Sequence, residues 1–150
     1  MPNSSVQIRL MQAADLEAVV RIDGKILGTP RSEYFEMKFE VLFESSDCLP
    51  TSLVAEDASG AVVGFVMGTL YMGEFGIYQE QATLDTIGVD PEYQKKGIGE
   101  QLVGDFVAHL KSLGVKKLST LVDTDDAKLT HFFGANRFVP SKIVNLERRL

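Results

Sequence analysis

The stretch 84–102, LDTIGVDPEYQKKGIGEQL, constrains this chain more than any other part of its sequence. Mostly apolar residues from Thr83 to Val89 predict a strand, and Pro91, which cannot donate a ladder hydrogen bond, requires that strand to finish at Asp90. From Gly97 onward the apolar residues recur at three- and four-residue steps, which predicts a long helix. They are Ile98, Leu102, Phe106, Leu110 and Leu113. The chain therefore passes from a strand into a helix through a short turn.

That turn, from Gln94 to Gly99, has the chemistry of an anion-binding site. Gly97 and Gly99 let the backbone approach a bulky group, and the first N–H groups of the helix point outward at the positive end of its dipole. Lys95 and Lys96 add positive charge. The turn matches neither the P-loop, which ends in Gly-Lys-Ser/Thr, nor the dinucleotide fingerprint G-x-G-x-x-G. It indicates a pyrophosphate site, and an ordinary strand-to-helix turn with solvated lysines is the alternative.

The rest of the chain reads as a mixture of strands and helices. Strand patterns are expected at 6–10, 52–56, 61–71, 83–89, 117–122 and 144–150, and a loop at 72–81. Helical patterns cover 16–26, 32–45, 97–113 and 125–136. No repeat or linker divides the sequence, so residues 1–150 are expected to form one α/β domain of order β-α-α-β-β-β-α-β-α-β.

The strand–turn–helix segment resembles the signature of the GNAT superfamily of N-acetyltransferases. That signature is a strand ending in Val-x-Pro, then Gln/Arg-x-x-Gly-x-Gly/Ala at the start of a long helix. Val89-Asp90-Pro91 and Gln94-Lys95-Lys96-Gly97-Ile98-Gly99 match every position. The order of elements is similar over the full length. The resemblance implies a mixed, mostly antiparallel central sheet of six or seven strands with about four helices.

The same resemblance implies which residues bind the co-substrate, acetyl-CoA. In such proteins the signature strand carries a bulge, and its free backbone N–H groups bind the acetyl carbonyl and the pantetheine arm. By position these groups belong to Ile87 and Val89, with Gly88 between them. Backbone N–H groups of the turn would hold the pyrophosphate; they belong to Gln94, Lys95, Lys96, Gly97, Ile98, Gly99 and Glu100.

The last helix departs from the family pattern at its catalytic position. Aligned on that pattern, the coenzyme-binding positions of the helix are occupied by Asp126, where the family has Asn, and by Phe133, where it has Tyr. The family's Tyr hydroxyl serves as general acid for the departing thiolate, and Phe133 has no proton to donate. Leu121 stands where some members carry a glutamate base.

Asp85 is the first candidate for a catalytic side chain. It precedes Ile87 by two residues on an otherwise apolar strand, so both side chains are expected on one face. A carboxylate there would accept the amine proton or anchor a cationic acceptor, and a hydrogen-bonded structural aspartate is the alternative. Asp123, at the end of the next expected strand, is a second carboxylate candidate, with a helix cap as the alternative that is favoured. His131 is expected to be a solvated surface residue. By analogy, the helix carrying Arg31, Glu33, Tyr34 and Phe35 and the loop carrying Tyr78 would line the acceptor side.

Composition narrows the partners. The net charge of −6 and pI near 4.9 argue against nucleic acid or an anionic membrane surface as the main partner. The single cysteine, Cys48, excludes an internal disulfide, and no apolar leader is visible, so a cytoplasmic location is expected. No metal is expected.

The predicted function is acetyl transfer to a primary amine of a small molecule or peptide, the alternative being an acyl-CoA-binding sensor. Dimers are frequent in the family, so a homodimer is possible.

Overall fold

The computed structural model describes residues 5–44, 51–71 and 81–150. In chain order the elements are β1 (Gln7–Leu10), α1 (Leu16–Leu27), α2 (Ser32–Glu44), β2 (Leu53–Glu56), β3 (Val62–Tyr71), β4 (Gln81–Val89), α3 (Ile98–Ser112), β5 (Lys117–Ser119) and α4 (Ala127–Ala135). Single 3-10 turns, η1 (Ala13–Asp15) and η2 (Pro91–Tyr93), precede α1 and follow β4. The chain divides into two units, Met1–Thr120 and Leu121–Leu150.

The sheet of the first unit has its strands in sequence order, β1-β2-β3-β4-β5. The first four strands pair antiparallel, and β4 pairs parallel with β5 over Gln81–Thr83. A parallel pair needs a long crossover connection, which α3 provides. Within the described ranges the sheet thus has five strands, and the expected number of six or seven is wrong.

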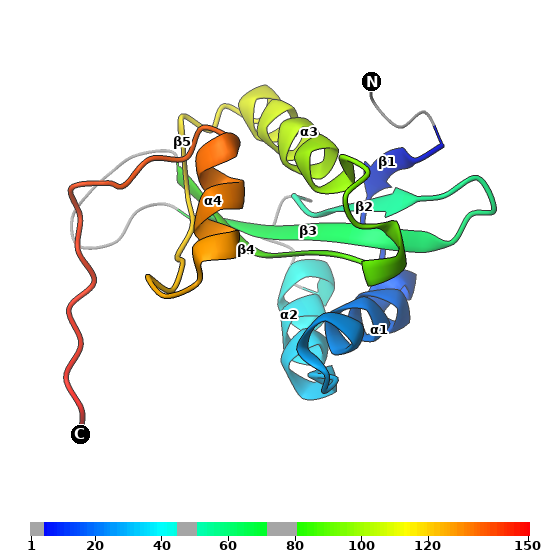
Figure 1. Cartoon of the computed structure of the whole chain (residues 1–150), viewed down its shortest axis with the longest axis horizontal. Helices are drawn as coiled ribbons and strands as arrows, with labels where there is room; N and C mark the ends of the chain where they lie inside the picture. Colours follow the sequence, from blue (N-terminus) through cyan, green and yellow to red (C-terminus); the bar gives the residue numbers. More distant parts are fainter. Residues whose placement is uncertain (1–4, 45–50, 72–80) are drawn as a thin grey trace. The chain divides into compact units, whose positions relative to one another are not determined.

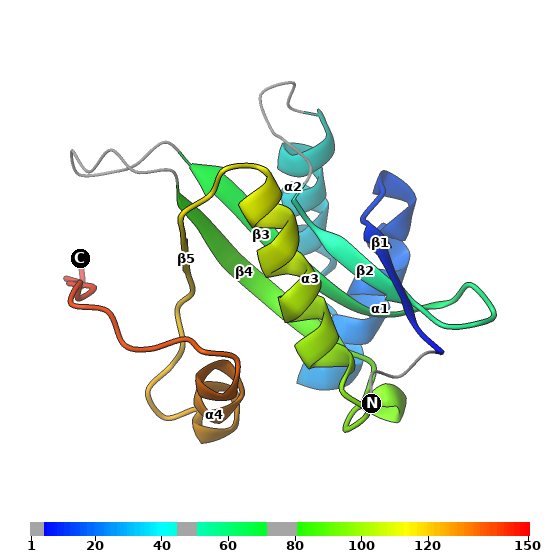
Figure 2. The ribbon, with the colours of Figure 1, turned by 90° about the horizontal axis from the view of Figure 1, so that it is seen from above.

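Two helical layers cover the sheet. Figures 1 and 2 show α1 and α2 on one face and α3 on the other. The core under α1 and α2 contains Val19, Ile22, Phe35, Phe65 and Met67, each fully buried. Burying a side chain of this size contributes about 1.5–3 kcal/mol, so this layer holds the N-terminal helices firmly on the sheet.

Close packing on the α3 face explains two glycines of β3. A Cβ on Gly64 would lie 3.1 Å from Leu102 Cδ1, and one on Gly68 would collide with the Phe106 ring. Both Leu102 and Phe106 are fully buried. The helix therefore rests directly on the strand backbone, and this contact fixes where its N-terminus lies relative to β4.

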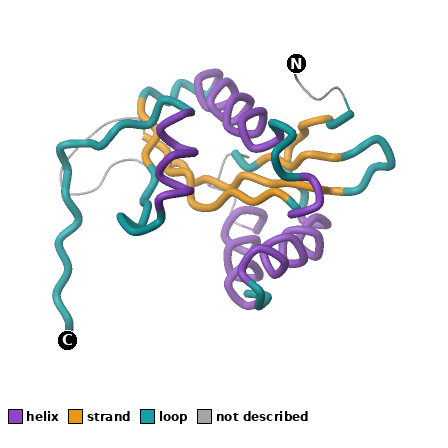
Figure 3. The backbone as a smooth tube through the Cα atoms, in the orientation of Figure 1, coloured by secondary structure: helices purple, strands orange, loops and turns teal. Residues whose placement is uncertain are grey.

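The second unit contains α4 and an extended C-terminal segment. Figure 3 shows no strand after α4, so the strand expected at 144–150 and the final β of the expected order are wrong. Val144 and Leu146 are 74% and 90% exposed. Alternation of apolar and polar residues makes a segment suitable for a strand, but a strand also needs a neighbour to accept its hydrogen bonds. Nor is any helix in the described part of the chain long and apolar enough to cross a membrane.

Candidate active site

The turn between β4 and α3 presents the open N-terminus of a helix. Gly97 is the N-cap of α3, and its carbonyl accepts a hydrogen bond from the Gln101 N–H at 3.0 Å. The N–H groups of Ile98, Gly99 and Glu100 come before it and have no carbonyl one turn back within the helix. Gly97 has φ +81°, and a Cβ there would meet no atom within 4 Å. Open space therefore lies beside these amides.

The turn keeps its shape through two backbone residues with positive φ. Lys95 has φ +64° and Gly97 +81°, while Lys96 between them is exposed. A lysine in the left-handed region costs roughly 1 kcal/mol or more, so surrounding contacts must hold it there. The sequence signalled the glycine but not the strained lysine.

Two side-chain contacts hold the turn from the side. The buried Asp90 carboxylate accepts hydrogen bonds from the Glu92 N–H at 3.0 Å and from Lys25 Nζ of α1 at 2.9 Å. Burial alone would raise the pKa of Asp90, but these donors hold it below its usual value. The Tyr93 hydroxyl donates to Asp57 Oδ2 at 3.0 Å, in the turn between β2 and β3. The Lys96 ammonium lies 5.3 Å from the centre of the Tyr93 ring.

The edge of β4 away from β3 carries the amides predicted to bind the acyl group. Asp90 N–H donates to the Val63 carbonyl at 2.8 Å, and Gly64 pairs with Val89. Hydrogen-bonded and non-bonded pairs alternate along an antiparallel ladder. The N–H groups of Ile87 and Val89 therefore point away from β3. The ladder to β5 reaches only Thr83, so Ile87 and Val89 lie beyond it.

The family resemblance places the bulge around Gly88, but the pairing of 87–89 with β3 is regular and the bulge lies at Asp85, so Gly88 has a different explanation. A Cβ at Gly88 would lie 2.8 Å from Phe65 Cε1 and 3.1 Å from Ile26 Cδ1. The glycine is required by packing under α1. On the same edge as the Val89 amide, Gln94 Nε2 donates to the Val89 carbonyl at 3.0 Å and links the strand end to the turn.

A bulge in β4 separates Asp85 from the predicted acyl-binding edge. Met67 pairs with Thr86 and Gly68 with Leu84, so Asp85 is the extra residue. Ile87 pairs with Val66, so their side chains lie on the same face of the sheet. Val66 is two residues from Gly64, where a Cβ would point at Leu102 of α3, so this is the α3 face. The Asp85 side chain instead lies on the opposite face, where it contacts Lys38 of α2. The expectation that Asp85 and Ile87 share a face is therefore wrong, because the bulge shifts the alternation by one residue.

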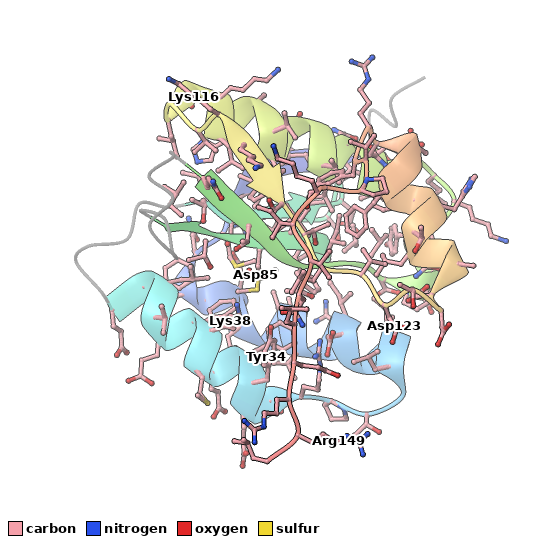
Figure 4. All side chains as sticks on the ribbon, turned by 90° about the vertical axis from the view of Figure 1, so that its left-hand side faces the viewer. Tyr34, Lys38, Asp85, Lys116, Asp123 and Arg149 are labelled. Atoms are coloured by element: carbon pink, nitrogen blue, oxygen red, sulfur yellow. The ribbon has the colours of Figure 1, made fainter. Side chains whose placement is uncertain are left out.

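The Asp85 carboxylate is held by three donors. Lys38 Nζ of α2 and Thr69 Oγ1 donate to Oδ2 at 2.9 and 2.6 Å, and Thr83 Oγ1 donates to Oδ1 at 2.8 Å. Figure 4 shows Lys38 and Asp85 facing each other. These donors use three of the roughly four acceptor positions of the carboxylate and leave one on Oδ1. The structure thus gives Asp85 the hydrogen bonds of the structural alternative, and its catalytic role stays a prediction.

Further along α2, Tyr34 lies beside a second ion pair. Arg31 Nε and Nη2 donate to the two Asp23 oxygens at 2.9 and 2.8 Å. The Arg31 guanidinium lies 4.7 Å from the centre of the Tyr34 ring, and Lys38 Nζ lies 5.8 Å from it. Phe35 belongs to the core and Glu33 is exposed. Tyr78 and Cys48 lie outside the described residues.

In the second unit Asp126 caps α4, and its Oδ1 accepts from the Leu129 N–H at 2.9 Å. Phe133 is buried with its ring 5.4 Å from Phe132 and 5.1 Å from Phe138. The predicted coenzyme contacts of Asp126 and Phe133 stay predictions.

The other candidates of this unit behave as ordinary surface residues. Leu121 is 87% exposed and His131 is exposed. The Asp123 carboxylate accepts from the Asp125 N–H at 2.8 Å in a local turn, and the expected helix cap at Asp123 is wrong because Asp126 caps α4.

Sequence reasoning missed Lys38, Thr69 and the Asp57–Tyr93 pair. A carboxylate within an apolar strand signals that partners must exist, because an unpaired charge is costly to bury. The identity of the partners was not readable, since Lys38 and Asp85 are 47 residues apart in the chain.

Comparison with known proteins identifies the family of this chain. The family model described as the Acetyltransferase (GNAT) family matches residues 16–136, and the chain belongs to that family. Among individual proteins, mycothiol acetyltransferase of Propionibacterium freudenreichii is 31% identical over 81 residues. The match covers 54% of this chain and only 25% of that protein, so the chain spans a minor part of this relative.

Solved structures share the fold over nearly the whole chain. An aminoglycoside N-acetyltransferase, AAC(6')-Iy in complex with CoA, has a TM-score of 0.79 at 18% identity, covering 99% of this chain and 98% of its own. Ard1 from Thermoplasma volcanium has a TM-score of 0.74 at 22% identity, covering 91% and 84%.

Proposed function

We propose that this chain transfers an acetyl group from acetyl-CoA to a primary amine of a small molecule or peptide by direct attack. Membership of the acetyltransferase family supports the reaction class. The observation that carries the proposal for this chain is the pairing of an open helix N-terminus with a strand edge whose Ile87 and Val89 amides point away from β3. The aminoglycoside N-acetyltransferase with the same fold was solved in complex with CoA, which is consistent with this assignment.

Each part of the site has a task in this reaction. Amides from Gln94 to Glu100, with Lys95 and Lys96, would hold the pyrophosphate at the positive end of α3. The Ile87 N–H would donate to the thioester carbonyl oxygen, where negative charge develops, and the Val89 N–H would hold the pantetheine arm. The amine nitrogen then forms a bond to the carbonyl carbon, the carbon–sulfur bond breaks, and the thiolate leaves with the electron pair.

The reaction also moves one proton away from the amine and one onto the sulfur. The attacking amine loses one and the departing thiolate gains one; Phe133, at the family's acid position, supplies none. Positioning and carbonyl polarisation are able to carry much of such a reaction, because a thiolate is a tolerable leaving group. We infer that water exchanges both protons unless Asp85 accepts the first.

The test is a thiol-release screen with acetyl-CoA across amino acids, polyamines, amino sugars, peptide N-termini and lysine peptides. We expect amine-dependent release of CoA with at least one class, and an acetylated product by mass spectrometry. Calorimetry with CoA runs in parallel. Binding without any transfer would support the acyl-CoA-binding alternative, and absence of binding would overturn both.

A further inference from the structure

The acceptor side of α2 carries two matched ion pairs on either side of one aromatic ring. Asp23 with Arg31 and Asp85 with Lys38 each sum to zero charge, and Tyr34, 37% exposed, lies between the two cations. Figure 4 shows Tyr34, Lys38 and Asp85 along this side of the sheet. The proposed function leaves this arrangement unexplained, since none of these side chains is needed to hold the coenzyme.

The position of Asp85 does not depend on Lys38. The hydroxyls of Thr69 and Thr83 donate to its two oxygens at 2.6 and 2.8 Å, so neutral groups already fix the carboxylate. Lys38 adds a third bond, at 2.9 Å, and the only positive charge among these donors. Its specific contribution is therefore to cancel the charge of Asp85.

The Lys38–Asp85 pair is partly exposed, so a ligand is able to contact it. The Lys38 and Asp85 side chains are 27% and 18% exposed. Asp85 lies two residues before Ile87, with the bulge of β4 between them. A second ammonium group on an incoming acceptor would reach an uncompensated carboxylate at this place and bind it. With Lys38 present, that place is occupied by the protein's own ammonium, and a second cation meets a like charge.

The geometry points to Lys38 as a residue that sets acceptor specificity, by occupying the site on Asp85 where a second amino group of the acceptor would bind. The acceptor class that fits is an amine with one amino group on a neutral body, for which the Tyr34 ring is an apolar surface. Polyamines and other polycations gain nothing here. This inference rests on the proposed acetyl transfer.

The experiment compares two acceptors that differ by one amino group, pentylamine and 1,5-diaminopentane. The measured quantity is the ratio of kcat/KM for the diamine to that for the monoamine, with the statistical factor of two removed. We expect a ratio below about 3 for the wild type. Lys38→Met keeps much of the side-chain volume and removes the charge, and should raise the ratio roughly tenfold, the size of one charge-assisted hydrogen bond. Lys38→Arg should keep the wild-type ratio.

The double variant Lys38→Met/Asp85→Asn separates this role from general damage. It should return the ratio to the wild-type value, because no carboxylate remains to bind the second ammonium. A ratio is informative even if Asp85 also accepts the proton, since that loss would affect both acceptors alike. Coenzyme affinity and thermal unfolding check that each variant is folded, and Lys38→Gln replaces Lys38→Met if the latter is not.

The outcomes separate the role of Lys38 from the proposed acetyl transfer. A wild type that already prefers the diamine tenfold, a Lys38→Met ratio equal to wild type, or a double variant that keeps a raised ratio would each overturn the role of Lys38. If only peptides are acetylated, the same ratio is measured with a peptide pair that carries lysine or norleucine beside the reacting residue. A wild type that acetylates no amine at all removes the proposed function, and this inference with it.

Discussion

Replacing Gly97 by alanine tests the coenzyme site without filling the core. Gly97 has φ +81° and empty space where a Cβ would stand, so the cost of the change is backbone strain of about 1–2 kcal/mol. If the turn relaxes out of the left-handed region, coenzyme binding must restore it, which should raise the Kd for CoA roughly tenfold for each 1.4 kcal/mol.

Gly28→Ala is the matched control. Gly28 ends α1 with φ +85°, and a Cβ there would likewise meet no atom within 4 Å. Both variants should lose a few degrees of Tm, since about 1 kcal/mol corresponds to roughly 2–4 °C in a domain of this size. Calorimetry with CoA should show a weaker complex for Gly97→Ala and an unchanged one for Gly28→Ala. Equal affinities in the two variants would refute the assignment of the turn.

Further changes test the remaining assignments. Phe133→Tyr supplies the missing hydroxyl and should keep coenzyme affinity within a few-fold while preserving or raising turnover; loss of activity in a folded, CoA-binding variant would show that α4 is misaligned. Asp85→Asn should lower turnover about 10²-fold at neutral pH, with a smaller loss at higher pH, if Asp85 accepts the amine proton; wild-type rates would leave it a structural role. Hydrogen bonds from Ser59, Ala61 and Tyr93 lower the pKa of Asp57 from 3.8 to about 2, so the stability it contributes is present above pH 4 and is lost as pH falls toward 2. Acid unfolding of Asp57→Asn should therefore be less steep in that range, and an unchanged profile would contradict the contacts described.

The sequence predicted local structure well where one pattern was sufficient to specify it. The strand end at Pro91, the turn at Gly97 and the helix from Ile98 follow from residues that restrict the backbone directly. The strand expected at 144–150 failed because alternation specifies a face and not a pairing partner. The Lys38–Asp85 contact was likewise unreadable, because it depends on how α2 lies across β4 and not on any local pattern.

The face on which Asp85 lies was also unreadable from the sequence, because it depends on the register of β4. Counting by twos from Ile87 placed its side chain on the α3 face, and the inserted residue reversed that result. The family resemblance carried the expectation of a bulge at 87–89, and the structure has the extra residue at Asp85 instead. Its location is visible only in the pairing of Met67 with Thr86 and Gly68 with Leu84.

The bulge also gives β4 two halves that are free to diverge separately. Before the bulge, the side chains of Thr83 and Asp85 lie on the α2 face; after it, the side chain of Ile87 lies on the α3 face. Under the proposed function, changes at 83–85 and on α2 would alter the acceptor side, while the edge that carries the Ile87 and Val89 amides would stay constant. Deleting one residue of the bulge would turn every β4 side chain on one side of the deletion to the opposite face of the sheet.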